Sequence, residues 1–348
     1  MLKQRLLIGF AIMALLLAAS VAASAATCTF TTVKKTKILN GNCTTTTSIV
    51  VPDGYTLDGA GHTITAMDPI GNHFKGGIIQ NGGAVANVTN VTVTVSGLAN
   101  VCDAGPDRLR GVLFDGASGS ITNVTALNIN QGASGCQEGN GIEVRNFGAS
   151  PTTIRVNIDG NTVTGYQKNG ITANGDTDAT ITDNVVKGAG PINYNAQNGI
   201  QVGFGATGMV KRNTVSDNSY TGASTIATGI LITSDQSSGD ELCVGVQVMQ
   251  NTVSENDVGV IAQQVGFDGF NAPATATNVK IVNNTISKAG ITNGYVYQAG
   301  VADQGNNDKI ISNTISGAGY DPGNPCGCTF AVDADSSFTN RAKVHANK

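Results

Sequence analysis

Two carboxylates and one guanidinium group are the side chains whose types and spacing best suit catalysis: Asp115, Glu143 and Arg145. Asp115 and Glu143 fall in neighbouring units of a repeat described below, so we expect roughly 8 Å between their Cα atoms. Inverting glycosidases need a carboxylate pair with room for a water molecule between them. These three residues are therefore candidate catalytic groups acting on a sugar chain. The alternative is that Asp115 and Arg145 form a surface ion pair, which would contribute under about 1 kcal/mol.

Further polar side chains in the same part of the chain suit binding. They supply carboxylates, cations, amides and two aromatic rings, which are the groups that hydrogen-bond to sugars and stack on them. With the catalytic candidates they would form a contiguous polar strip between residues 107 and 203, whereas later units are apolar or plain at the same positions. The candidate substrate-binding residues are Asp107, Arg108, Arg110, Glu138, Tyr166, Lys168, Asn174, Tyr194, Gln197 and Gln201.

Asp176 and Asp178 are the only residues that suggest a cofactor. Alternating acids on a loop offer the hard oxygen ligands that calcium prefers. A capped turn is the alternative explanation for the same two residues. We expect no other metal ion or cofactor, and we interpret His73 as a surface histidine rather than a catalytic group.

A repeat of about 30 residues must position these side chains. A glycine followed by Ile or Val recurs along the chain, in steps of 34, 30, 29, 29, 30, 30 and 41 residues. Such a period is typical of repeat architectures, in which no single unit can bury its apolar side alone. The pairs are Gly77-Ile78, Gly111-Val112, Gly141-Ile142, Gly170-Ile171, Gly199-Ile200, Gly229-Ile230, Gly259-Val260 and Gly300-Val301, and a ninth unit would begin near Phe330.

A second motif, Asn-x-[Val/Ile], recurs in phase with the glycines. Apolar residues alternate in the short segments around it, which places one side of each predicted strand against a core. Stacked units would bury a column of Ile and Val, and the asparagines would form an internal ladder of side chains. The predicted ladder contains Asn161, Asn184, Asn213, Asn251, Asn284 and Asn313, with Asn123 as a weaker member.

This double pattern resembles the right-handed parallel β-helix superfamily, which includes pectate-lyase-like and NosD-like proteins. The segment Thr56-Leu57-Asp58-Gly59-Ala60-Gly61-His62-Thr63-Ile64 is typical of how such helices begin, and the resemblance covers roughly residues 49–333. It implies an all-β fold, namely a right-handed single-stranded parallel β-helix, or solenoid, of about nine coils. It carries over no catalytic residue, because the signatures of polygalacturonases and pectate lyases are absent from the sequence.

The first 26 residues have the three-part pattern of a secretory signal peptide. Lys3 and Arg5 precede an apolar run over residues 6–21, and small residues follow at the expected cleavage site. We expect residues 27–75 to form an N-terminal cap and the first strands, and residues 76–333 to form the parallel β-helix. Residues 334–348 would be a polar, frayed C-terminal tail. An insertion around residues 267–277 would be a surface loop.

Seven cysteines in an exported chain favour disulfide bonds, and the odd number leaves one thiol over. One predicted pair brackets the N-terminal cap, and the other joins the same loop on neighbouring coils. These pairs are Cys28 with Cys43 and Cys102 with Cys136. No histidine lies near the Cys326-x-Cys328 segment in the sequence, so a structural role is favoured there over metal binding.

The formal charge of −4 becomes −6 when Lys3 and Arg5 leave with the signal peptide. A mildly acidic chain lacks the basic stripe that nucleic acid requires. No apolar stretch of the mature chain is long enough to cross a membrane. We therefore expect a soluble, secreted or extracytoplasmic protein.

The first functional hypothesis is that the protein binds or processes an extracellular polysaccharide. If it is an enzyme, it would be a polysaccharide lyase or a glycoside hydrolase. The concentration of charge on a few coils favours this hypothesis. The alternative is a non-catalytic surface or envelope protein that serves as an adhesin or a scaffold. The absence of Trp and of any lyase or hydrolase signature favours the alternative.

Overall fold

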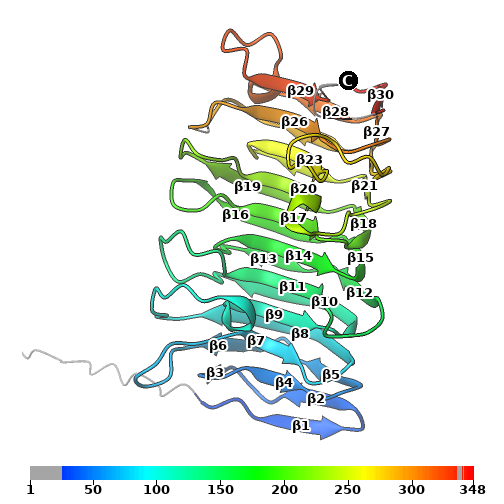
Figure 1. Cartoon of the computed structure of the whole chain (residues 1–348). Helices are drawn as coiled ribbons and strands as arrows, with labels where there is room; N and C mark the ends of the chain where they lie inside the picture. The colour runs from blue at the N-terminus through cyan, green and yellow to red at the C-terminus, as the bar shows by residue number, and fades with distance from the viewer. Residues whose placement is uncertain (1–25, 293, 335–338, 340) are drawn as a thin grey trace, which may run out of the picture.

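The chain winds into an elongated stack of parallel coils, as the computed structural model of residues 26–292, 294–334, 339 and 341–348 shows (Figure 1). One face of the stack is a ten-stranded sheet, and each of its strands belongs to a different coil of the described chain. The predicted parallel β-helix is therefore confirmed, with about ten coils. In order along the stack, the strands of this sheet are β4 (Ile49–Val51), β7 (Gly77–Asn81), β9 (Arg110–Asp115), β11 (Asn140–Asn146), β14 (Asn169–Gly175), β17 (Asn198–Gly203), β20 (Thr228–Asp235), β23 (Val258–Val265), β26 (Gln298–Asp303) and β29 (Thr329–Asp333).

The remaining strands form a second, twenty-stranded sheet that bends around the other sides of the stack. Its strands are β1 (Phe30–Val33), β2 (Thr36–Leu39), β3 (Cys43–Thr45), β5 (Tyr55–Asp58), β6 (Thr63–Ala66), β8 (Val85–Val95), β10 (Ser118–Leu127), β12 (Ile154–Asp159), β13 (Thr162–Thr164), β15 (Thr177–Thr182), β16 (Val185–Ile192), β18 (Thr207–Lys211), β19 (Thr214–Tyr220), β21 (Gln247–Met249), β22 (Thr252–Ser254), β24 (Lys280–Val282), β25 (Thr285–Ser287), β27 (Lys309–Ile311), β28 (Thr314–Ser316) and β30 (Lys343–His345). Short 3-10 helices η1 (Gly105–Asp107), η2 (Gln236–Ser238) and η3 (Ala318–Tyr320) lie in the loops.

The repeated glycines are vertical neighbours, as the sequence period predicts. Ile142, Ile171 and Ile200 pair in register on β11, β14 and β17, and all three are fully buried. A Cβ atom on Gly141 would lie 2.3 Å from Cγ1 of Val163, a residue of the opposite sheet. The glycine thus permits a close approach of the two sheets that any larger residue would prevent.

The asparagine ladder is confirmed and is longer than predicted. From Asn161 to Asn313 each Nδ2 atom donates to the Oδ1 atom of the next asparagine over 2.8–3.0 Å, and Asn347 extends the row at the C-terminal end. Asn123 does not belong to this ladder. Its backbone is left-handed (φ 53°), and its exposed side chain donates to Asn90 on the outside of the stack. The left-handed turn rotates its amide away from the interior.

Both ends of the stack differ from simple caps or tails. At the N-terminal end, β1 pairs antiparallel with β2, and β2 already pairs parallel with β5, so the first coils lie within residues 27–75. At the other end, β30 pairs with β27 and continues the solenoid. The expectation of a frayed tail is therefore wrong for residues 343–345, because they pair with the edge strand of the last coil. The predicted signal peptide, apart from residue 26, lies outside the described residues.

Disulfide bonds connect the predicted partners Cys28 with Cys43 and Cys102 with Cys136. A third bond joins the remaining close pair, Cys326 and Cys328, and Cys243 is left as a buried thiol. The predicted insertion is a surface loop, in which Phe267 is 80% and Phe270 is 76% exposed. Within the described residues, no helix has the length and apolar character needed to span a bilayer.

Candidate functional site

A groove follows the outer face of the ten-stranded sheet and consists of three adjoining cavities of about 270, 440 and 360 Å³. The first two share Gln137 and Lys168, and the last two share Ile226 and Gln263. We call them the arginine, lysine and tyrosine sections, in order from the N-terminal end. The arginine section contains Arg108, Arg110, Glu143, Arg145, Asn174 and Gln201. The lysine section contains Lys168, Tyr194, Asn198, Tyr220, Ser224 and Thr228, and the tyrosine section contains Tyr295, Tyr297, Ala302, Asp303, Gln304 and Asp333.

A buried ion pair forms the floor of the arginine section. Nε of Arg110, at the start of β9, lies 2.5 Å from Oε2 of Glu143 on β11, and both side chains are almost fully buried. Asn140 also donates to Oε2 of Glu143, over 2.9 Å. The guanidinium of Arg110 donates to the backbone carbonyl of Arg108 over 2.6 Å, which ties the loop before β9 to the sheet.

Arg145 bridges the two carboxylates that the sequence offered as a catalytic pair. Its Nη2 lies 2.7 Å from Oδ2 of Asp115, and its Nη1 lies 3.6 Å from Oε1 of Glu143. Burial opposes the charge of Arg145, but the two carboxylates together raise the pKa of its guanidinium. The predicted ion pair between Asp115 and Arg145 is therefore present, and both oxygens of Glu143 already have cationic neighbours.

Arg108 differs from its arginine neighbours because it has no carboxylate partner among the described residues. Its Nε is buried without a hydrogen-bond acceptor in the described part of the chain, and the side chain lines the arginine section. The loop that carries it is held by Glu138, whose two oxygens accept the backbone N–H groups of Asp103 (2.8 Å) and Leu109 (2.7 Å). The guanidinium of Arg108 therefore has an N–H group available for a ligand, and it is carried over the groove by a loop that hydrogen bonds hold in place.

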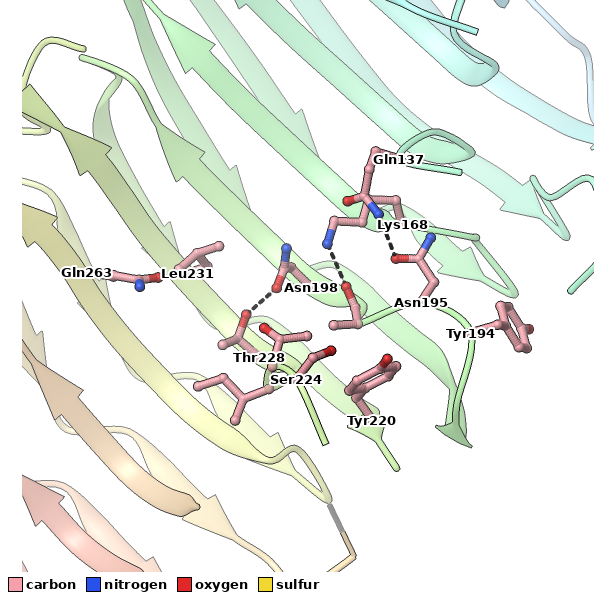
Figure 2. Close-up of a pocket in the computed structure, with 13 residues that line it drawn as sticks. Gln137, Lys168, Tyr194, Asn195, Asn198, Tyr220, Ser224, Thr228, Leu231 and Gln263 are labelled. Carbon is pink, nitrogen blue, oxygen red and sulfur yellow. Dashed lines mark hydrogen bonds between the residues drawn. The ribbon is translucent and has the colours of Figure 1, made fainter. Parts of the chain in front are cut away.

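A second cation without a carboxylate neighbour occupies the lysine section (Figure 2). Nζ of Lys168 donates to the carbonyl of Ala196 over 2.7 Å, and burial lowers the pKa of this amine to about 8. Beside it runs a polar row in which Thr228 donates to Asn198 (2.5 Å) and Asn198 donates to Asn169 (3.0 Å). The rings of Tyr194 and Tyr220 flank the same cavity.

The tyrosine section is acidic and aromatic. The hydroxyl of Tyr297 donates to Oδ2 of Asp333 over 2.5 Å, and burial together with this carboxylate raises the pKa of the phenol. The ring of Tyr297 lies 5.6 Å from that of Phe330, measured between centroids. The outward residues Ile261 and Ala302 are apolar, and the polar groups of this section come from Gln263 on β23, from the loop before β26, and from the ends of β26 and β29.

The structure brings most of the predicted site residues together. Seven of them line the arginine section and one, Tyr194, lines the lysine section, which Lys168 also borders. Asp115 lies at the rim, paired with Arg145. The seven are Arg108, Arg110, Glu143, Arg145, Lys168, Asn174 and Gln201.

Four predicted binding residues do not face the groove. Asp107 points elsewhere and pairs with Lys75 over 3.0 Å. The prediction that they bind the ligand is not supported for Tyr166, Glu138 and Gln197, which are buried and line none of the three sections. Tyr166 donates to Asn218 in the interior, and Gln197 donates to the backbone carbonyl of Tyr166 over 2.5 Å. These residues form hydrogen bonds with buried backbone and amide groups. The sequence shows that they are polar, but it does not show whether they face the solvent or the interior.

Several groove residues were missed by the sequence interpretation. Asn169 and Asn198 precede the coil glycines, and the recurring Asn-Gly-Ile at residues 140, 169 and 198 was a usable signal for this row. Tyr297 and Asp333 had no such signal, because they come from a loop and from the last coil of the ten-stranded sheet. Of the calcium candidates, Asp178 lies on β15 of the opposite sheet, 3.7 Å from Arg155, and Asp176 lies in the turn before that strand. That calcium site stays a prediction.

Coils, ladder and groove together define a right-handed parallel β-helix protein. Residues 110–315 match the family described as right handed beta helix region, and the chain belongs to this family. Among solved structures it is similar to the Dettilon tailspike protein (gp208), with a TM-score of 0.53 and 14% identity over 90% of this chain. The chain spans 59% of the length of that tailspike.

Two further solved structures are similar at lower scores. The periplasmic alginate epimerase AlgG matches with a TM-score of 0.43 and 13% identity over 91% of this chain and 79% of its own. The A-module of the Azotobacter vinelandii mannuronan C-5 epimerase AlgE6 matches with a TM-score of 0.38 and 13% identity over 88% of each chain. The chain matches none of the curated proteins. At 13–14% identity, the similarity to these structures concerns the fold alone.

Proposed function

We propose that this protein is exported and binds an acidic polysaccharide along the groove of the ten-stranded sheet. The observation that carries the proposal is the pair of groove cations, Arg108 and Lys168, which have no carboxylate partner among the described residues. Arginine binds carboxylates through two parallel hydrogen bonds, and a desolvated cation gains most from an anionic ligand. Export is supported by the disulfide bonds, which persist in oxidising compartments.

The groove also has the other features that a sugar chain requires. It crosses successive strands from β9 to β29, so consecutive sugar units would meet different coils. The row of Asn169, Asn198 and Thr228 supplies amides and a hydroxyl that are already oriented by one another. Tyrosine rings flank the lysine and tyrosine sections and offer apolar faces for stacking.

Binding to immobilised glycans tests the proposal. The wild-type protein should bind polyuronates more tightly than neutral polysaccharides of equal length, and the affinity should fall with rising salt because the contacts are ionic. Arg108→Ala and Lys168→Ala should each weaken polyuronate binding. Arg155→Ala is the matched control, since this exposed arginine lies on β12, in the opposite sheet. Equal binding of neutral and acidic chains, or equal losses in all three variants, would contradict the proposal.

Processing of the bound chain is a second candidate function, favoured by the lowered pKa of Lys168. An amine with a pKa of about 8 is partly neutral near physiological pH and can accept a proton from a sugar carbon next to a carboxylate. The bond between the neighbouring carbon and the glycosidic oxygen would then break, a carbon–carbon double bond would form, and the leaving oxygen would take a proton from water. The unsaturated product absorbs ultraviolet light. Release of such a product by the wild type and not by Lys168→Arg would establish a lyase. Hydrolysis is less well supported, because Arg145 bridges Asp115 and Glu143.

A further inference from the structure

The interior of the solenoid changes character in the coil that contains β26. In six preceding coils the third residue after the glycine faces the core and is apolar, and these residues pair in register from one strand to the next. Asp303 pairs with Ala262 as the next member of this column and is only 3% exposed. A carboxylate thus takes a place in the apolar core. The preceding members are Phe114, Val144, Ala173, Val202, Ile232 and Ala262.

Asp308 makes the same kind of replacement at a second position. It directly precedes β27, as Val246 precedes β21 and Val279 precedes β24, and these three strands pair in register. All three residues are fully buried. The coil that contains β26 and β27 therefore has two carboxylates at positions that are apolar in the preceding coils. Burying a charge without compensation is strongly unfavourable.

The oxygens of Asp303 and Asp308 are only partly satisfied by the protein. Oδ2 of Asp303 accepts a hydrogen bond from Thr339 over 2.6 Å, and Oδ1 of Asp308 accepts from Thr277 over 2.6 Å and from the backbone N–H of Val279 over 2.7 Å. Oδ2 of Asp308 is buried and has no hydrogen-bond partner among the described residues. Within the same part of the chain, no lysine, arginine or histidine lies within ion-pair distance of either carboxylate.

Asn306 supplies another buried oxygen without a partner. Its Nδ2 donates to the carbonyls of Pro273 (2.8 Å) and Ala274 (3.0 Å), which fixes the orientation of the amide and leaves Oδ1 without a donor among the described residues. The backbone N–H of Asn306 donates to Thr277 over 2.7 Å, the hydroxyl that also binds Asp308, so Asn306 belongs to the same cluster. This amide oxygen is a further buried acceptor without a donor among the described residues, beside the acidic pair, and it suits a positively charged ligand.

Gly305 shows how closely these groups approach one another. Its N–H donates to Oδ1 of Asp303 over 3.3 Å, and a Cβ atom on it would lie 2.0 Å from Oδ2 of Asp308. The unpartnered oxygen of Asp308 is therefore next to the segment that carries Asp303. Burial, reinforced by the neighbouring Asp303, raises the pKa of Asp308 to about 8, so the two carboxylates interact directly.

We propose that Asp303, Asp308 and Asn306 bind a hard metal cation, of which calcium is the best match, inside the C-terminal part of the solenoid. Calcium takes carboxylate, amide carbonyl and water oxygens in flexible arrangements, and two carboxylates would balance its charge. The site adjoins the tyrosine section of the groove, because Asp303 and Gln304 also line that section. The role of the cation would be to stabilise the packing of the last coils, beneath the tyrosine section, by neutralising the buried carboxylates.

The test is metal binding by the purified full chain after treatment with a chelator and dialysis. Calcium should bind with a stoichiometry of one in titration calorimetry and should raise the melting temperature in a saturable way, whereas sodium at equal ionic strength should not. The double variant Asp303→Ala/Asp308→Val restores the residue types of the coils below, so it should fold and lose both effects. The variant Asp176→Asn/Asp178→Asn should keep both, because those residues lie outside the cluster.

Three results would overturn the proposal. The first is a wild type that binds no calcium and whose stability falls as the pH rises toward 8, which would mean that the carboxylates share a proton. The second is a double variant that retains the calcium effect, which would place the ion elsewhere. The third is a loss of calcium binding in the Asp176→Asn/Asp178→Asn variant, which would assign the ion to that loop. Because none of these measurements uses a glycan, failure here and failure of the proposed polysaccharide binding are distinguishable.

Discussion

The arginine and tyrosine sections of the groove lie on the same sheet and are built in different ways. In the arginine section most charged groups stand on strand positions, where Glu143 and Arg145 alternate along β11, and Arg108 adds a cation from the loop before β9. In the tyrosine section the equivalent outward residues are Ile261 and Ala302, and a loop residue, Tyr297, supplies a polar group. The polar groups of the first section thus belong mostly to the repeat, whereas those of the second come largely from departures from it.

This difference has an electrostatic consequence. The arginine section presents an unpaired cation, Arg108, above a floor of paired charges, and the tyrosine section presents Asp333 without a cationic partner among the described residues. An acidic chain is therefore expected to be held most strongly at the arginine and lysine sections. The tyrosine section suits the less charged parts of a chain or a bridging cation.

The largest expected effect comes from breaking the buried pair of the arginine section. Arg110→Met should lower the free energy of unfolding by roughly 3–5 kcal/mol, because it leaves the buried carboxylate of Glu143 without its main partner. Denaturant unfolding measures this loss. The double variant Arg110→Met/Glu143→Leu should recover much of it.

A matched control for that prediction is the exposed pair of Arg212 and Asp183, whose closest atoms are 2.6 Å apart. Arg212→Met should change stability little, since water already solvates both charges. Equal losses in the two arginine variants would mean that burial does not distinguish the floor of the arginine section from an ordinary surface pair.

The pH dependence of binding distinguishes the lysine section from its arginine neighbour. The pKa of Lys168 is lowered to about 8, so the amine loses its charge as the pH rises through that value, whereas glycan carboxylates stay ionised. The affinity for a polyuronate should therefore fall between about pH 7 and 9, by roughly tenfold if one charge-assisted contact is lost. Isothermal titration at several pH values tests this, and Lys168→Arg should abolish the step.

Tyr297→Phe probes the opposite end of the groove with a smaller change. It removes the hydrogen bond to Asp333 and should lower the free energy of unfolding by about 1 kcal/mol. Affinity for a polyuronate should change less than in Arg108→Ala, because the tyrosine section carries no cation among the described residues. If the loss of affinity were the same for both variants, the two sections would not differ as described.

The smallest expected effect belongs to Asp115→Asn. This half-exposed residue forms a rim ion pair with Arg145, so its replacement should change stability by under about 1 kcal/mol and leave glycan affinity nearly unchanged. Thermal unfolding and the same glycan titration measure both quantities. A severe loss of product formation in an otherwise stable Asp115→Asn protein would instead restore its interpretation as a catalytic residue.

Prediction from sequence succeeded where equal positions recur in every coil. The stacked column of Ile142, Ile171 and Ile200 follows from the period alone, and so does the internal asparagine ladder. It failed where a polar residue serves the interior of a loop, as Glu138 and Tyr166 do. A period assigns a residue to a row, but it does not reveal whether a neighbouring loop folds over that row and buries it.

The amino-acid sequence by itself determined the solenoid, because glycine, β-branched residues and asparagine each satisfy one local requirement that repeats with every coil. Only the tertiary structure decided which polar groups are free to meet a ligand. Arg108 is available because Glu138 and Arg110 brace its loop over the sheet, and Asp303 and Asp308 meet because both residues that flank the turn between β26 and β27 face the same interior. Such encounters depend on packing between segments whose spacing in the sequence carries no periodic signal.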